Sequence, residues 1–559
     1  MTQSVTATPL RSESTPMPMT PELRRGIDRI RDYLFGGGYP NPAQNAEQMS
    51  FLIYFYMYEA ADAARVRAAN RPGAEPHVSA FEGHWNLRNP RNAREPGVEA
   101  VPRELLRWSS WAHALNGERL VNWVREEVFA FHAELAAGGV TDFMDGARLV
   151  IDEPTVLTQV VSQLNDLHLD RVDADTKGDL FEHVLRQIRQ AGELGQFRTP
   201  RHVIGALVRL VDPRIGETIF DPAAGTAGFL VGAWDHIRLA NSSPAGIEEV
   251  EADGKTVRRG LGDMLSRKAV RRLHEATFHG SDVDPQMVRL ATMNLTLRGL
   301  DKVRVLRRDA LTRSLDRTAK AELGLPAHGF DVILANPPFS GRLDRDRIVE
   351  DVKVGRTAQT ELLFLQYMIN HLKDGGRCGV VVPEGVLFGS TGAHKELRRR
   401  LVENNTVEAV LSLPGGVFNP YSGVKTSVLV FRKGGATGRV MFLHADNDGF
   451  KLDANHDLPI EEDDLPGLTE AFRDREARWR QWSDRDREAD WTEKWWFAEA
   501  DAIRAADFNL SAGRHRPQNR AKVEYRDPLE ILDELRAIET EILGEIDELA
   551  EAVRGALEE

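Results

Sequence analysis

Cysteine is almost absent from this sequence of 559 residues, in which Cys378 is the single example. One thiol cannot form an internal disulfide or supply a cysteine-rich metal site, which excludes disulfide scaffolds and zinc-finger-type proteins. We therefore expect no metal site and, by default, a cytoplasmic protein. Long apolar runs are missing too, because no stretch approaches the roughly 20 residues of a membrane span. Residues 1–20 are rich in Thr, Ser and Pro, lack the apolar core of a signal peptide, and are predicted to be a disordered tail.

Positive charge is also in short supply. The formal net charge is -14, whereas non-specific DNA affinity comes mainly from Lys and Arg side chains that neutralise phosphates. A DNA-binding function would therefore require locally concentrated positive charge or a basic partner. Residues 264–309 hold eight Arg and two Lys against five acids, which fits either such a patch or a solvated helix face.

The overall composition is that of a globular protein long enough for more than one domain, 42% hydrophobic and 28% charged. Residues 21–175 have apolar residues at helical spacing and are predicted to form an N-terminal helical domain. Their dense aromatics, which include Phe51, Phe55 and Trp111, are expected in its core, with a DNA-stacking surface as the alternative. Residues 436–525 are charged and contain several Trp, and their pattern allows no fold assignment.

Residues 526–559 show the pattern of a coiled-coil-like helix. Apolar residues recur there at steps of three or four, at Leu535, Ile538, Ile542, Ile546, Leu549, Val553 and Leu557. Such a seam needs a partner, which could be another copy, a domain of this chain or a different protein.

Residues 176–435 alternate short apolar runs with helical patterns. This alternation predicts an α/β fold with a doubly wound, Rossmann-like and mainly parallel sheet. Ligands of such sheets bind beyond the carboxyl ends of the strands. A polar stretch at residues 241–262 interrupts the pattern and is expected to be a surface insertion.

Two motifs at predicted strand ends suggest a ligand site. Residues 221–228 (Asp-Pro-Ala-Ala-Gly-Thr-Ala-Gly) follow one strand, and their small side chains would let the backbone approach a ligand closely. The loop lacks the Lys of a phosphate-binding P-loop, and alone it could be a simple tight turn. Asp282, with Asp284 as substitute, ends a later strand where a carboxylate could accept hydrogen bonds from a ribose. The alternative is a turn-forming pair of Asp residues before Pro285.

A third motif, Asn336-Pro337-Pro338-Phe339, also follows a strand. An exocyclic amine conjugated into a base is a poor nucleophile. If the Asn336 side chain and the Pro337 carbonyl accepted its two protons, the nitrogen would move toward tetrahedral geometry and its lone pair would face an electrophilic methyl group. Phe339 would stack on the base, which must first be flipped out of the helix. The alternative is a strand followed by a proline-rich turn.

Together the Asn336–Phe339 and Asp221–Gly228 motifs resemble amino-methylating DNA methyltransferases of the adenine type. The segment Gly195–Arg201, which lies ahead of the glycine loop, is similar to that of the modification subunits of type I restriction-modification systems, in the gamma ordering of motifs. The resemblance implies that S-adenosylmethionine is the cofactor. It implies cofactor contacts for Gln196, Phe197, Arg198, Thr199, Pro200, Arg201, Ala224, Gly225, Thr226, Ala227 and Gly228. Asp221 would lie near the amino end of the cofactor, Asp282 at its ribose and Asp309 at its adenine.

The resemblance also implies a complex. It implies double-stranded DNA as the substrate, a specificity subunit that binds two copies of this chain, and a restriction subunit in the full assembly. A protein glutamine N-methyltransferase shares the Asn-Pro-Pro motif and is the alternative enzyme, although such enzymes usually carry Tyr where Phe339 stands. A catalytically inactive scaffold that binds DNA or partners is the other alternative.

Overall fold

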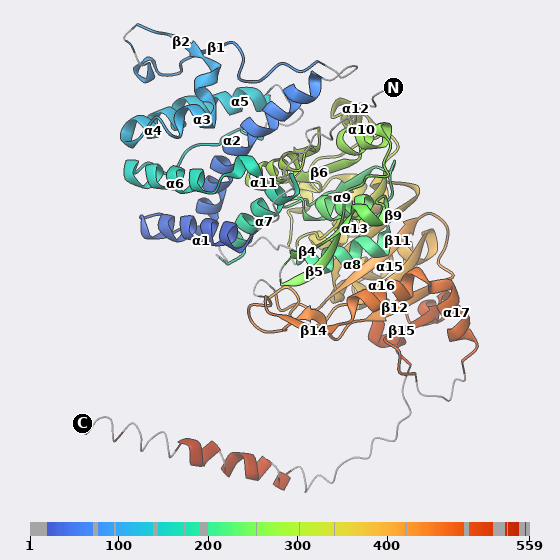
Figure 1. The fold of residues 1–559 in the computed structure, drawn as a ribbon. Coiled ribbons are helices and arrows are strands. Elements are labelled where there is room, and N and C mark those ends of the chain that lie inside the picture. The colour runs from blue at the N-terminus through green and yellow to red at the C-terminus, as the bar shows by residue number, and fades with distance from the viewer. Residues whose placement is uncertain are drawn as a thin grey trace, which may run out of the picture.

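The computed structural model describes residues 20–517, except residues 71–75, 94, 96, 138–142, 173, 191–198, 253, 301, 340, 420–421 and 486–490, together with residues 532–533, 535–540, 542–546 and 554. The predicted tail at residues 1–20 lies outside the described residues apart from Thr20. Figure 1 shows a helical part, coloured blue to teal, beside an α/β part coloured green to red. None of the helices in the described part is long and apolar enough to cross a membrane.

The helical part is built around buried aromatic side chains. Its helices are α1 (Pro21–Gly36), α2 (Pro42–Ala69), α3 (Trp108–Trp111), α4 (Gly117–Trp123), α5 (Phe129–Ala137), α6 (Pro154–Asp166) and α7 (Ala174–Gln190), and a short hairpin joins β1 (His84–Asn86) to β2 (Ala100–Pro102). Phe51, Phe55 and Trp111 are each at most 2% exposed. Their rings therefore form the core that the sequence favoured and are not available for stacking on DNA.

The two parts share a packing interface. Leu180 and Phe181 of α7 and Met287 and Leu290 of α11 (Pro285–Leu297) belong to the same apolar core as the helical part. The helical packing thus extends beyond residue 175 and onto the α/β part.

One mixed sheet of nine strands forms the centre of the α/β part, in the order β15-β12-β10-β11-β9-β8-β3-β6-β7. The strands are β3 (Ile219–Asp221), β6 (Phe278–Asp282), β7 (Arg304–Arg307), β8 (Phe330–Ala335), β9 (Leu372–Pro383), β10 (Asn405–Ser412), β11 (Thr426–Lys433), β12 (Arg439–His444) and β15 (Trp495–Glu499). β7, β6, β3, β8 and β9 run parallel, which confirms the predicted Rossmann-like half. β11 and β15 are antiparallel to their neighbours. Because β12 and β15 extend this sheet, it continues past residue 435 into the segment whose fold the sequence left unassigned.

Helices cover both faces of the sheet. On one face lie α8 (Arg201–Val211), α9 (Gly228–Ala240), α10 (Arg267–Glu275), α11 and α16 (Leu465–Arg473), and on the other lie α13 (Thr360–His371), α15 (Gly392–Asn404) and α18 (Ala500–Ala505). Side chains of β3 alternate between the two cores, with Ile219 on the first face and Phe220 on the second.

Shorter elements complete the α/β part. They are α12 (Arg317–Glu322), α14 (Glu384–Phe388), α17 (Arg475–Ser483) and α19 (Ala512–His515), with the hairpins β4 (Ile247–Ala252)–β5 (Lys255–Gly260) and β13 (Asp448–Phe450)–β14 (Pro459–Asp463). The β4–β5 hairpin accounts for the polar insertion predicted at residues 241–262.

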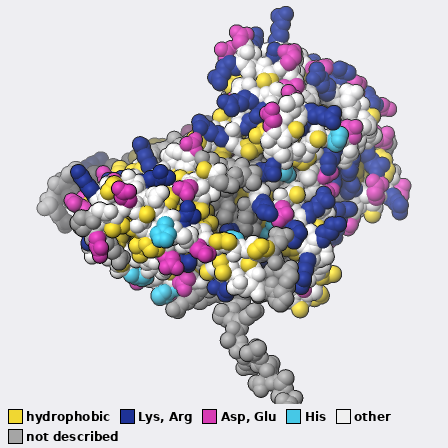
Figure 2. Space-filling model, turned by 90° about the horizontal axis from the view of Figure 1, so that it is seen from above, with side chains coloured by type: hydrophobic (Ala, Val, Ile, Leu, Met, Phe, Trp, Pro, Cys, Tyr) yellow, Lys and Arg dark blue, Asp and Glu magenta, His cyan; other side chains and the backbone are white. Residues whose placement is uncertain are grey.

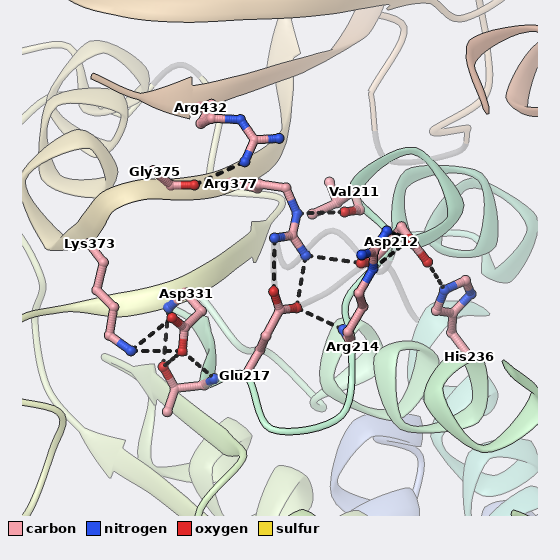
Figure 3. A network of polar contacts seen from close by, with 11 residues as sticks. Val211, Asp212, Arg214, Glu217, His236, Asp331, Lys373, Gly375, Arg377 and Arg432 are labelled. Atoms are coloured by element: carbon pink, nitrogen blue, oxygen red, sulfur yellow. Dashed lines mark hydrogen bonds and ion pairs between the residues drawn. The ribbon is translucent and has the colours of Figure 1, made fainter. Parts of the chain in front are cut away.

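A network of ion pairs and hydrogen bonds lies at the amino ends of β3 and β8 (Figure 3). Arg377 of β9 donates to both Glu217 carboxylate oxygens at 2.8 and 2.9 Å and to the carbonyls of Val211 and Asp212 at 2.9 Å. Beside it, Lys373 donates to both oxygens of Asp331 at 2.8 Å. These contacts join α8, β3, β8 and β9 at the end of the strands opposite the glycine loop.

Candidate active site

The predicted site residues lie at the carboxyl ends of neighbouring parallel strands. Asp221 ends β3 and Asp282 ends β6, while Asn336 directly follows β8. In the ladder Asp221 pairs with Gly280, and Phe220 pairs with both His279 and Ile333. Because these strands are parallel and in register, the fold brings the motifs together at one edge, as the doubly wound pattern predicts.

Backbone hydrogen bonds hold the glycine loop against the end of β6. The Gly225 N–H donates to Asp282 Oδ2 at 2.9 Å, and the Ala224 N–H donates to the Ser281 carbonyl at 3.0 Å. Gly225 and Ala227 have φ angles of 51° and 67°, in the left-handed region. A Cβ atom on Gly225 would meet no atom within 4 Å, so the loop backbone borders open space there.

Gly228 has a different neighbourhood from Gly225. It begins α9, and a Cβ atom there would lie 2.9 Å from Ile204 Cδ1 on α8. Close packing of α8 on α9 is therefore the reason for glycine at this position. The resemblance of the loop to methyltransferases implies a cofactor contact for Gly228 instead.

Two buried carboxyl groups flank the loop. The pKa of Asp221 is raised to about 8, mainly by burial and to a smaller extent by the nearby Asp282 charge, against the opposing effect of a hydrogen bond from the Ala223 N–H. Burial also raises the pKa of Asp282, whose two oxygens accept the N–H groups of Gly225 and Asp284 at 2.9 Å. A positively charged group placed beside Asp221 would favour its ionised form.

The Asn336 carboxamide is held in one orientation by Thr199. Its Nδ2 donates to the Thr199 hydroxyl at 2.9 Å. Its Oδ1 is buried and has no hydrogen-bond partner within the part of the chain that the structure describes. A buried carbonyl oxygen without a donor is uncommon in folded proteins and marks a place where a ligand N–H would fit.

The rest of the Asn336–Phe339 motif is fixed by its neighbours. Pro337 is buried and Pro338 exposed, and the Thr360 hydroxyl donates to the Pro338 carbonyl at 3.4 Å. The Phe339 ring is 6% exposed and packs edge-on against Phe418, with centroids 5.6 Å apart.

Gln196, Phe197 and Arg198 lie outside the described residues. Pro200 is buried and precedes α8. The Arg201 guanidinium forms an ion pair with Glu182 of α7, so in this structure it is directed at the helical part and not at the glycine loop. Asp309 accepts the N–H groups of Leu311 and Thr312 at 3.0 and 3.3 Å and holds the turn after β7.

Several supporting residues escaped the sequence analysis. Asn294 of α11 donates to the Thr226 carbonyl at 2.8 Å and also accepts a hydrogen bond from Arg298. Arg298 in turn pairs with Glu182 at 3.1 Å. This chain of contacts connects the glycine loop through α11 to α7 and Arg201.

Glu361, the second residue of α13, is another residue that the sequence did not single out. Its side chain is 7% exposed, and its Oε2 atom has no hydrogen-bond partner among the described residues. Burial raises the pKa of this carboxyl group. It follows Thr360, whose hydroxyl contacts the Asn336–Phe339 motif.

The site has the features that S-adenosylmethionine would require. Open space beside Gly225 would admit a ligand close to the backbone, and Asp282 retains lone pairs for hydroxyl donors. The buried Asp221 carboxyl group would be stabilised in its charged form by an ammonium group. Asn336 Oδ1 lies at the neighbouring strand end, where it could accept a hydrogen bond from a second molecule.

Comparisons with known proteins agree with this geometry. The family profile described as N-6 DNA Methylase matches residues 172–524. The chain is 32% identical over 365 residues to the type I restriction enzyme EcoEI methylase subunit of Escherichia coli, covering 63% of this chain and 68% of that protein. It is 30% identical over 327 residues to the EcoKI methylase subunit of Escherichia coli strain K12, covering 55% of each chain.

Solved structures resemble almost the whole chain. One comes from work on complex assembly and conformational transition of the type I R-M system; it has a TM-score of 0.62 at 27% identity and covers 96% of this chain and 98% of its own. The modification subunit of a putative type I restriction enzyme from Vibrio vulnificus YJ016 also has a TM-score of 0.62. It is 22% identical, covers 88% of this chain and 94% of its own, and supports the fold.

Proposed function

Since this chain belongs to the N-6 DNA methylase family, we propose that it transfers the methyl group of S-adenosylmethionine to the N6 amine of an adenine in DNA, as the modification subunit of a type I restriction-modification complex. The observation that carries the residue assignment is the Asn336 carboxamide. The Thr199 hydroxyl accepts a hydrogen bond from Asn336 Nδ2, and the buried Asn336 Oδ1 has no partner among the described residues.

The chain's own groups prepare the amine for reaction. Asn336 Oδ1 accepts one N–H of the adenine amine, and the Pro337 carbonyl accepts the other, so the nitrogen lone pair is no longer committed to the ring. S-adenosylmethionine, when bound, would supply an electrophilic methyl group to this nitrogen, and the amine proton lost on transfer would be one of the two that face these acceptors. The base must be flipped out of the duplex to reach these acceptors. Phe339 would stack on the base after its ring, which is 6% exposed and packed against Phe418, turned toward the site.

The cofactor would bind along the glycine loop. We assign Ala224, Gly225, Thr226 and Ala227 to its close contacts, Asp282 to its ribose and Asp309 to its adenine. Asp221 would face its ammonium group. Thr199 and Pro200, with Gln196, Phe197 and Arg198, would cover its methionine end. Arg201 and Gly228 would stabilise the site without contacting the cofactor, because Arg201 pairs with Glu182 and Gly228 packs on Ile204.

Transfer of a labelled methyl group tests the proposal. The full chain, co-expressed with its specificity subunit, is incubated with labelled S-adenosylmethionine and either DNA or total protein, and the products are digested and identified by mass spectrometry. We expect label in N6-methyladenine. Label in glutamine side chains would support the protein methyltransferase instead, and cofactor binding without any transfer would support an inactive scaffold.

The net charge and the C-terminal helix both support the proposal that this chain binds a partner protein. The net charge is -14, and on the face in Figure 2 Lys and Arg side chains are interspersed with Asp and Glu. The described residues of 532–546 are helical, and their apolar side chains are about half exposed: Leu532, Leu535, Ile538, Ile542, Leu543 and Ile546. We assign this helix to docking on the specificity subunit. Two copies of the chain would bind one specificity subunit, and the restriction subunit would be a separate polypeptide. Truncation after Tyr525 should abolish assembly with the specificity subunit in size-exclusion chromatography; unchanged assembly would contradict this role.

A further inference from the structure

A cluster of two histidines and one aspartate lies outside the site described above. His202 Nε2, on the first turn of α8, lies 2.8 Å from Asp448 Oδ2 at the start of β13. His456 Nε2, between β13 and β14, lies 2.9 Å from the same oxygen. The three ligand atoms all lie within 4.8 Å of one another. Residues far apart in the chain thus direct three potential ligands at one point.

The cluster is nearly closed to solvent. The side chains of Asp448 and His456 are 0% exposed and that of His202 is 14% exposed. A buried carboxylate is costly unless it is paired or coordinates a metal ion. The exposed part of His202 leaves one route by which an ion or a water molecule could enter.

Surrounding contacts fix the orientation of the cluster. Phe450 stacks on the His202 ring with centroids 4.5 Å apart, and Lys255 lies over Phe450 while pairing with Asp463 at 2.8 Å. Asp453 accepts the His456 N–H at 3.0 Å and stabilises its left-handed backbone, with φ at 48°. Because Lys255 balances Asp463, Asp448 is the charge left for the two imidazoles. These contacts hold the His202 ring and the His456 backbone in place.

We propose that His202, Asp448 and His456 bind a single Zn²⁺ ion. Two imidazole nitrogens and one carboxylate oxygen are a donor set that zinc prefers, with a water molecule in the fourth position. Zinc–ligand bonds of about 2.0–2.2 Å require tetrahedral ligand atoms roughly 3.3 Å apart. The two His–Asp pairs need to separate by only a few tenths of an ångström from 2.8 and 2.9 Å, and the two imidazole nitrogens lie within 4.8 Å of each other.

The role of this ion would be structural. It would tie the β13–β14 hairpin to the start of α8, three residues after Thr199, whose hydroxyl holds Asn336. The same ion would therefore steady the segment that orients the catalytic carboxamide. The scarcity of cysteine led the sequence analysis to expect no metal site, but a site built from His and Asp needs no thiol.

The direct test uses the wild-type full chain and zinc alone. The protein is stripped with a chelator, titrated with Zn²⁺ and examined by X-ray absorption at the zinc edge. We expect one ion per chain, with two imidazole ligands and one carboxylate oxygen at about 2.0–2.2 Å. Failure to take up stoichiometric zinc, or a spectrum without two imidazoles, would overturn the proposal without any variant.

Variants locate the site. Asp448→Asn and His456→Gln should each weaken zinc binding by at least about 100-fold in competition with a chromogenic chelator, and zinc should raise the Tm of the wild type but not of these variants. The matched control is His236→Gln, which removes a different imidazole whose Nε2 lies 2.9 Å from Asp212 and should leave zinc affinity unchanged. Equal affinity in all three variants would place zinc elsewhere and contradict the assignment.

Discussion

Similar polar groups lie at the two ends of strand β3, but they differ in their hydrogen-bond partners and in their pKa. At the amino end, Asp331 of β8 accepts hydrogen bonds from Lys373 and Thr218 at 2.8 Å. Burial opposes its ionisation, but those donors outweigh burial and its pKa is lowered. At the carboxyl end, Asp221 is buried without a cation and its pKa is raised to about 8. An aspartate is therefore ionised and paired at the amino end, whereas another aspartate is left for a ligand at the carboxyl end.

Hydrogen bonding shows the same contrast. Arg377 at the amino edge makes four hydrogen bonds to Glu217 and to two carbonyl groups (Figure 3). Asn336 at the carboxyl edge has one amide atom bonded and the other buried without a partner among the described residues. Satisfied groups stabilise a fold, whereas unsatisfied groups cost stability and mark positions reserved for substrate. Substitutions at the two edges should thus affect different measurements.

The largest effect is expected for Asn336→Ala at the carboxyl edge. Loss of this acceptor at the reacting nitrogen should lower the rate of methyl transfer on the order of 10²–10³-fold. Cofactor affinity, measured by calorimetry, and the free energy of unfolding should change little. A variant that keeps substantial activity would show that the motif is not the catalytic one.

At the amino edge, Arg377→Met should reduce the free energy of unfolding by about 2–3 kcal/mol, because Glu217 and two carbonyl groups lose their donor. Chemical denaturation of the full chain measures this, and the folded fraction should keep its methyl-transfer rate. Arg214→Met is the control, because that side chain is 74% exposed and should cost at most about 0.5 kcal/mol. Equal losses of unfolding free energy in the two variants would show that the Arg377 contacts stabilise the fold no more than the exposed Arg214 pair does.

Substitution of one glycine at each edge by valine compares the two edges, because Gly225 and Gly216 both have a positive φ angle. In Gly225→Val the added side chain would fill the open space beside the loop and should weaken cofactor affinity by roughly 10- to 100-fold. Gly216 precedes β3 at the amino edge and also has a positive φ, 91°, with open space around it. Gly216→Val should cost at least as much stability as Gly225→Val, because its φ lies further from the left-handed region that L residues adopt, but it should leave cofactor affinity unchanged. If both variants bound cofactor equally well, the glycine loop would be only a turn.

A gradual effect, small for each pH unit, is expected from the protonation of Asp221. Its raised pKa means that the folded chain holds a proton between about pH 4 and about pH 8 that the unfolded chain releases. Stability without cofactor should therefore fall as pH rises through this range, by at most about 1.4 kcal/mol per pH unit. Asp221→Asn should lack this slope in denaturation series at pH 5 to 8. A wild-type chain whose stability relative to the variant stays constant or rises would contradict the assignment.

The sequence located the candidate motifs at strand ends but did not reveal the residues that support them. Small residues after one apolar run and Asn-Pro-Pro-Phe after another placed both motifs at strand ends, because strand alternation and turn chemistry are local signals. The Thr199–Asn336 hydrogen bond spans 137 residues and leaves no periodic trace. The same holds for the contact between His202 and Asp448, and for Glu182 with Arg298.

The extent of the sheet was harder to predict than its parallel half. β12 and β15 are short strands within a charged, Trp-containing segment, and only their pairing with each other and with β10 reveals them. Gly228 shows the reverse difficulty, since a glycine that closes a helix contact looks in sequence like one that approaches a ligand.

A double-mutant cycle on Thr199 and Asn336 tests the central claim most directly, namely that Thr199 orients the carboxamide so that Oδ1 receives the target amine. Because Thr199 is also assigned to the methionine end of the cofactor, single-turnover methyl transfer is measured at saturating S-adenosylmethionine for the wild type, Thr199→Val, Asn336→Ala and the double variant. We expect Thr199→Val alone to slow transfer about tenfold, one hydrogen bond's worth, with rescue by Thr199→Ser, and to have no further effect in the Asn336→Ala background. Independent, multiplicative losses would contradict the account, because Thr199 would then act on the cofactor or the fold and not through Asn336.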